Sequence, residues 1–128
     1  MQTFTKSERL SSKVMIDKVF AGGRVITGPS FKLLWLGAGE LSDQPVKIVI
    51  TVPKRNFKRA VDRNKLKRRI REAYRKNKQP LYDQVKSETI CMMLMYTGKN
   101  IIEYGEIEEK IKKLLDRLAV EINVNALS

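Results

Sequence analysis

The residues of this chain best suited to chemistry are the arginines and lysines of one segment, residues 54–78. The segment holds 13 of the chain's 26 Lys and Arg residues but only two acids, so it carries +11 of the net charge of +12. A chain that is merely basic spreads its charge, whereas a surface that binds a polyanion concentrates it. The expected chemistry is recognition of phosphate groups, which the planar guanidinium of arginine binds through two hydrogen bonds.

Groups that perform catalysis are scarce. The chain has no histidine, the commonest general base and metal ligand. Its single cysteine, Cys91, has no partner for a disulfide, a zinc site or a Cys–His nucleophile pair, and we expect a buried apolar residue there. No phosphate-binding glycine loop occurs. We therefore predict no catalytic residue and no metal ligand in this chain.

The basic segment has the pattern of an amphipathic helix. The helix should begin between Lys58 and Asp62 and end near Asn77, before Pro80. At about 100° per residue, one side of the helix is apolar and should face a core. That side consists of Leu66, Ile70, Ala73 and Tyr74. The opposite side carries a row that we call the basic ridge, Asn64, Arg68, Arg71 and Arg75, flanked by Lys65, Lys67 and Lys78.

A solvated charged face is the simpler explanation of such a run. A solvated helix, however, usually places acids four residues from its bases to relieve repulsion. Only Asp62 and Glu72 do so here. We therefore favour compensation by a polyanion outside the protein.

The surrounding elements indicate one α/β (α+β) domain over residues 1–128, a length that can bury a single core. A first helix, capped by Ser11 or Ser12, should run to Ala21 and stop at Gly22. A last helix should begin near Glu106, with residues 123–128 frayed. Its apolar side is expected to face the sheet through Ile107, Ile111, Leu114, Leu115, Leu118 and Ile122. Strands are predicted at 24–27, 31–37, 46–52 and 89–96, the last buried on both faces. The order α-β-β-β-α-β-α predicts a two-layer sandwich with a mostly antiparallel sheet.

The expected location is the cytoplasm. No run of about 18 apolar residues exists, which excludes a membrane span. The N-terminal residues lack the apolar core of a signal peptide. No obligate protein partner is evident from the sequence.

The run from Arg63 to Ala73, RNKLKRRIREA, resembles the arginine-asparagine-basic motif of the bacterial ribonuclease P protein component. The resemblance covers most of the chain. It includes the opening FTKSERL at 4–10, DKVF at 17–20 followed by Gly23, VPKR at 52–55, and the Ala60-Val61 pair.

The resemblance implies an α/β sandwich of ribosomal-protein type with a left-handed β-α-β crossover, which the usual handedness rule disfavours. It also implies the small subunit of a ribonucleoprotein that removes the 5′ leader from precursor tRNA. The catalytic RNA subunit would hold the Mg²⁺ ions and cut the phosphodiester bond.

The resemblance implies two binding surfaces, each assigned to the residues of this chain that match the family's positions. The motif implies contact with the catalytic RNA by Arg63, Asn64, Lys65, Lys67, Arg68, Arg71 and Arg75. The family's cleft for the single-stranded leader matches Phe20, Phe31, Lys54 and Arg55. An aromatic ring there would stack on a base, while the cations would hold the backbone.

The chain departs from the family pattern in the cleft. Ile16 and Leu34 stand where aromatics are expected, Trp35 lies on the opposite strand face, and a residue is inserted around Asn56-Phe57. The departures fall in the base-stacking part of the cleft, whereas the cations that would hold the backbone, Lys54 and Arg55, match the family. Plain core packing is the alternative for Phe20, Phe31 and Trp35.

Two other functions remain open at this point. A structural RNA-binding protein, such as a ribosomal protein of similar fold, would share the charge and the sandwich but lack the cleft. An enzyme acting alone on nucleic acid is disfavoured by the missing histidine and by the lack of an acidic cluster beside the ridge.

Overall fold

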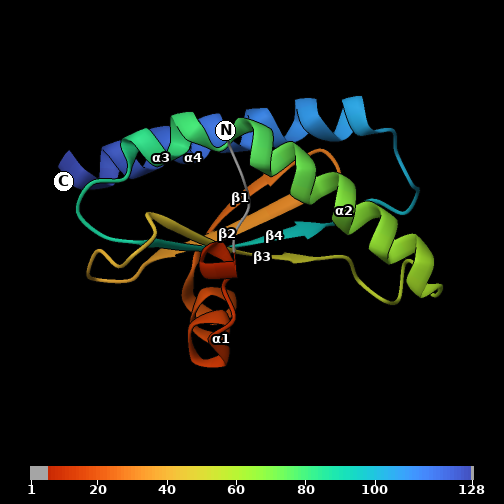
Figure 1. The fold of residues 1–128 in the computed structure, drawn as a ribbon, viewed down its shortest axis with the longest axis horizontal. Helices are drawn as coiled ribbons and strands as arrows, with labels where there is room; N and C mark the ends of the chain where they lie inside the picture. Colours follow the sequence, from red (N-terminus) through yellow and green to blue (C-terminus); the bar gives the residue numbers. More distant parts are fainter. Residues whose placement is uncertain (1–5, 128) are drawn as a thin grey trace.

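A computed structural model describes residues 6–127 of the chain. A four-stranded sheet separates two unequal helical layers (Figure 1). Helices α2 (Ala60–Asn77), α3 (Gln79–Gln84) and α4 (Tyr104–Leu127) cover one face of the sheet, and α1 (Lys13–Gly22) packs on the other. A short 3-10 turn, Lys6–Glu8, precedes α1. The predicted mixed fold is confirmed.

The strands run in the order β1-β2-β4-β3 across the sheet. The hairpin of β1 (Arg24–Gly28) and β2 (Phe31–Gly37) is antiparallel, and β2 pairs antiparallel with β4 (Ile90–Tyr96). The edge strand β3 (Val46–Thr51) pairs parallel with β4, so the chain from β3 through α2 and α3 to β4 is a crossover. The left-handed sense of that crossover stays a prediction.

The larger core lies between the sheet and helices α2 and α4. Every apolar residue predicted on the inner side of α2 is fully buried there, and α4 contributes its predicted row, with Ile122 partly buried at the end. From the strands, alternate residues point into this core, including Phe31, Leu33 and Trp35 of β2. The two helices and the sheet are thus held together by one continuous apolar cluster.

A smaller core fixes α1 on the opposite face. Val19 is fully buried against Leu34, Cys91 and Met93. The side chain of Ser12 caps the helix by accepting from the Met15 N–H at 3.3 Å. At the other end a Cβ on Gly23 would lie 2.4 Å from the Val19 carbonyl oxygen, so only glycine allows the sharp exit into β1.

Two predictions about the elements need correction. The sequence pattern does not predict helix α3, because Pro80 is expected only to stop the preceding helix, whereas it occupies the first turn of a new helix, where its missing N–H is harmless. Helix α4 begins at Tyr104, close to the predicted start near Glu106. It also continues through residues 123–127, which were expected to fray, while Ser128 lies outside the described residues.

Candidate nucleic-acid interface

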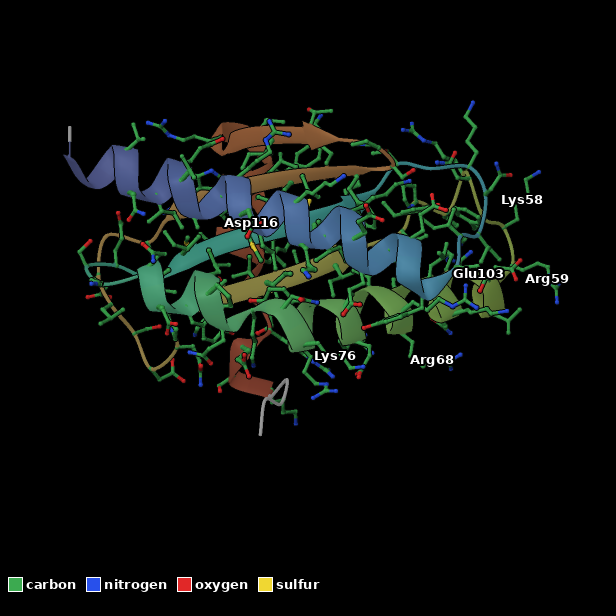
Figure 2. All side chains as sticks on the ribbon, turned by 90° about the horizontal axis from the view of Figure 1, so that it is seen from above. Lys58, Arg59, Arg68, Lys76, Glu103 and Asp116 are labelled. Atoms are coloured by element: carbon green, nitrogen blue, oxygen red, sulfur yellow. The ribbon has the colours of Figure 1, made fainter. Side chains whose placement is uncertain are left out.

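Helix α2 positions the predicted ridge. It begins at Ala60, inside the predicted window, and Asp62 stands in its first turn, where a negative charge favours the positive helix end. Its buried side is anchored by Leu66 and Ile70. The other side is left to solvent, and Figure 2 shows Arg68 projecting from α2 away from α4.

The seven residues predicted to contact RNA all lie on α2 but do not have equal surroundings. Asn64, Lys65 and Arg68 are exposed, so they present their polar groups outward. The other four are half-buried. The outward groups are available to a large partner, whereas the half-buried ones also have contacts within the protein.

Arg63 holds the loop that precedes the helix. Its Nη1 donates to the carbonyl oxygens of Phe57, at 2.6 Å, and Lys58, at 3.1 Å. Phe57 is 7% exposed and its ring lies 5.9 Å from that of Tyr96. The apparent insertion at 56–57 therefore supplies a core anchor for the loop that carries Lys54 and Arg55.

Arg75 belongs to an ion pair at the end of the ridge. Its Nε donates to a carboxylate oxygen of Glu72 at 3.0 Å, and its Nη2 donates to the other oxygen. This hydrogen bonding lowers the pKa of Glu72 and raises the pKa of Arg75, against the opposing effect of desolvation. The pair neutralises part of the ridge.

Lys78 does not flank the ridge as predicted. It is 5% exposed, and its ammonium lies 2.5 Å from a carboxylate oxygen of Glu8, which is itself 3% exposed. A buried lysine requires such a partner because an unpaired charge in the interior is very costly. The partner comes from the N-terminal segment, which the helical pattern of α2 cannot reveal.

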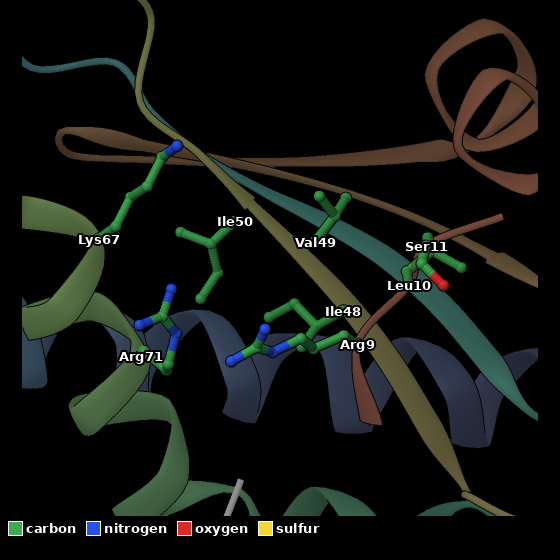
Figure 3. Close-up of a pocket in the computed structure, with 8 residues that line it drawn as sticks. All are labelled: Arg9, Leu10, Ser11, Ile48, Val49, Ile50, Lys67 and Arg71. Atoms are coloured by element: carbon green, nitrogen blue, oxygen red, sulfur yellow. The ribbon is translucent and has the colours of Figure 1, made fainter. Parts of the chain in front are cut away.

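Lys67 and Arg71 turn toward the edge of the sheet. With Arg9 they line a cavity of about 230 Å³, which we call the β3-edge pocket, together with Leu10, Ile48 and Ile50 (Figure 3). Arg9 pairs with Ile48 along the outer edge of β3, and the Leu10 N–H donates to the Ile48 carbonyl at 2.8 Å. Arg9 was not predicted as a site residue, since it stands far from the basic segment in sequence.

The four residues predicted for leader binding are not brought together as a group. Phe20 on α1 is 63% exposed, and Lys54 and Arg55 are exposed in the turn after β3. Phe31 is fully buried in the larger core, with its ring edge-on to Tyr96 at 5.2 Å. For Phe31 and Trp35, core packing is what the structure shows.

The alternation of side chains along β2 places a residue other than Phe31 on the α1 side of the sheet. Leu34 packs in the α1-side core, so Lys32, two residues earlier, lies on that same face and is exposed. Lys32 and Thr51 both pair with Met95, from its two sides. The Thr51 hydroxyl is shielded from solvent and has no hydrogen-bond partner in the described chain. The two-residue alternation of the strand alone could have indicated that Lys32, rather than Phe31, faces the α1 side.

Neither a metal site nor a membrane span emerges from the described residues. Within 6–127 no three His, Cys, Asp or Glu side chains gather where they could hold a metal ion. None of the helices in that range is long and apolar enough to cross a bilayer.

The fold and the site together define a class of protein, the small α+β sandwiches whose positive charge is gathered on one helix. The chain belongs to the ribonuclease P protein family, because the family model described as Ribonuclease P matches residues 4–119. That match includes the opening motif at 4–10, of which Phe4 and Thr5 lie outside the described residues.

Curated relatives agree with this membership. A ribonuclease P protein component of Porphyromonas gingivalis is 30% identical over 125 residues, covering 96% of this chain and 91% of the relative. One from Petrotoga mobilis is 36% identical over 121 residues, covering 91% and 96%. The matched regions therefore extend well beyond the basic motif.

Solved structures share the fold. The RNase P protein of Staphylococcus aureus superposes with a TM-score of 0.72 at 18% identity, covering 88% of this chain and 96% of that one. The protein from Thermotoga maritima gives a TM-score of 0.67 at 23% identity, covering 86% and 96%. The arrangement of sheet and helices is therefore that of the family.

Proposed function

We propose that this chain is the protein subunit of a ribonuclease P that removes the 5′ leader from precursor tRNA in the cytoplasm. The observation that carries the proposal is the gathering of +11 charges in a segment that folds largely into one helix with an exposed basic side. Asn64, Lys65 and Arg68 would contact the catalytic RNA directly. Membership of the family supports that partner.

The leader would bind on the α1 side of the sheet. Phe20 offers one exposed ring for stacking on a base, and Lys54 and Arg55 offer charge for the backbone. Lys32 lies on the same sheet face as the α1-side core and is exposed, so it can add a further charge to this surface. We therefore replace Phe31 with Lys32 in the proposed leader surface.

Magnesium would be bound by the RNA. The described residues do not offer a ligand set for the ion, so no step of the reaction is assigned to this chain's side chains. The protein would instead screen repulsion between the phosphates of leader and catalytic RNA. Such screening matters most when magnesium is scarce.

Reconstitution at low magnesium tests the proposal. Precursor tRNA is incubated with the protein, with the cognate ribonuclease P RNA, and with both. Cleavage at the mature 5′ end only when both are present is the expected result. Tight RNA binding without stimulation would instead assign the protein to the structural RNA-binding class, and cleavage by the protein alone would overturn the assignment of catalysis to the RNA.

A further inference from the structure

The two cations that follow β3 in the proposed leader surface lie at the corners of a single turn. The Asn56 N–H donates to the Pro53 carbonyl at 3.2 Å and closes a β-turn over residues 53–56. Lys54 and Arg55 are the two central residues of this turn, and both are exposed. The place of both side chains therefore depends on how the backbone is held on either side of the turn.

The core holds the chain before the turn and reaches it again just after. Strand β3 ends at Thr51, and Val52, which follows it, is 6% exposed. After the turn comes the apparent insertion at 56–57, whose Phe57 ring lies in the same core beside Tyr96. An apolar contact has no preferred direction, so it buries the ring without fixing the course of the backbone that leads into α2.

Arg63 supplies a directional contact to that backbone. Helix α2 begins at the N-cap Arg59 without a hydrogen bond from the side chain of that residue. Four residues later Arg63 reaches back, and its Nη1 donates to the Phe57 and Lys58 carbonyls at 2.6 and 3.1 Å. This nitrogen carries two N–H groups, so both are used. Hydrogen bonds from an ionised donor are stronger than neutral ones, so the exit of the turn is tied firmly to the helix.

This engagement distinguishes Arg63 from Arg68. Arg68 is exposed and projects outward from α2, whereas Arg63 is half-buried (Figure 2). A phosphate that took the Nη1 of Arg63 would deprive two carbonyl oxygens of that donor, one of them on Phe57, which is 7% exposed. A shielded acceptor that loses its donor is costly. Arg63 is therefore better suited to hold the protein's own backbone than to bind RNA.

We propose that Arg63 is a positioning residue for the leader, which acts through the turn at 53–56 and not by contact with the catalytic RNA. By tying down the exit of the turn, it holds Lys54 and Arg55 in place before the leader arrives. Cations that are already ordered lose less conformational freedom on binding, so the leader binds more tightly. This role deepens the proposed function and rests on it.

Leader length separates this role from RNA contact. Arg63→Met keeps the length of the side chain but removes its charge and its donors. With the ribonuclease P RNA, it should raise the KM for a precursor tRNA with a long leader by about fivefold, as the added ordering of one or two side chains does. The KM for a precursor with a one-nucleotide leader should stay unchanged. Affinity for the RNA subunit should change by less than about twofold, with the same salt slope, because the lost charge contacts no phosphate.

Arg68→Met is the matched control, because it removes the same groups from an exposed position on the same helix. It should lower affinity for the RNA subunit by about tenfold and leave the dependence of KM on leader length as in the parent protein. The proposal is overturned if Arg63→Met lowers RNA affinity and salt slope as Arg68→Met does, or if it raises the KM of both precursors equally.

Hydrogen exchange of the protein without RNA tests the turn itself. Arg63→Met should speed exchange of the Asn56 amide by about tenfold, while the Leu94 amide in the central strand β4 exchanges as before. Unchanged exchange at Asn56 would overturn the proposal whatever the RNA does. A parent protein that fails to stimulate cleavage would instead refute the proposed function, and the exchange would still decide whether Arg63 fixes the turn. Circular dichroism verifies folding, and Arg63→Gln is the second variant if Arg63→Met does not fold.

Discussion

The ammonium of Lys78 lies 2.5 Å from a carboxylate oxygen of Glu8 in the protein interior. Tyr82 of α3 donates from its hydroxyl to the same carboxylate, and burial together with this bond raises the pKa of the tyrosine. The pair joins the segment before Leu10 to the junction of α2 and α3. It thereby holds Arg9 beside the edge of β3, so a buried contact far from the ridge helps to shape the β3-edge pocket.

Breaking this pair should be strongly destabilising. Glu8→Gln leaves the Lys78 charge in the interior without its counter-charge, which costs about 3 kcal/mol or more of unfolding free energy. Glu106→Gln is the control, because Glu106 pairs with Lys110 on the exposed side of α4 and its loss should cost under about 1 kcal/mol. Urea unfolding measures both. Similar losses in the two variants would contradict a special role for the buried pair.

The two phenylalanines at 20 and 57 should respond very differently to truncation. Phe57 is 7% exposed and packs near Tyr96, so Phe57→Ala should cost about 3 kcal/mol or more through the cavity it leaves. Phe20 is 63% exposed, so Phe20→Ala should change stability by only about 0.5 kcal/mol. Chemical denaturation checks both, and a large loss for Phe20→Ala would show that its ring packs in solution.

Cys91 should be nearly inert in the folded protein. Burial raises the pKa of its thiol, with a smaller opposing effect from Lys47, so at a given pH less of the reactive thiolate is present than in the unfolded chain. At about pH 8, a thiol reagent should label the native protein far more slowly than the urea-unfolded protein. The native rate should rise with pH over a range shifted upward. Equal native and unfolded rates at neutral pH would contradict the burial.

The helices were largely predictable because their signals are local. The apolar side of α2 repeats at helical spacing, and its charge cannot be buried, so the inner and outer sides follow from the sequence. The same holds for α4, whose predicted row packs against the sheet. The end of α4 was mispredicted because residues 123–127 lack an apolar pattern, yet the helix continues through them.

Features that depend on contacts between distant segments were not predictable in this way. Lys78 resembles any other ridge cation until Glu8, 70 residues away, is placed beside it. Arg9 becomes a site residue only because the N-terminal segment pairs with β3. Phe31 is a different case, since the alternation along β2 already groups it with Leu33 and Trp35. Its burial therefore follows from the sequence, although the family resemblance implies a place in the leader cleft.

RNA binding by this protein should depend steeply on salt. If about six or more phosphates are contacted, affinity for the ribonuclease P RNA should fall by about 10³-fold or more between about 50 and 200 mM salt. Arg68→Gln should reduce the slope by about one, whereas Lys112→Gln, which removes an exposed charge from α4, should leave it unchanged. Filter binding over a salt series measures the slopes. A shallow slope for the parent protein would contradict recognition through the phosphate backbone.

Substitutions on the two faces of the sheet should separate assembly from substrate binding. Arg68 is exposed on α2, so Arg68→Ala should weaken assembly with the catalytic RNA by about tenfold, as the loss of a charged contact does. Phe20 is exposed on α1, on the opposite face, so Phe20→Ala should raise the KM for precursor tRNA while changing assembly little. Single-turnover cleavage and RNA affinity, measured on the same preparations, give both quantities. A precursor tRNA with a one-nucleotide leader is the control, because it leaves almost no leader to bind the proposed surface, and its KM should not depend on Phe20. Equal effects of both substitutions on assembly would reject the two-surface arrangement and indicate one continuous RNA-binding surface.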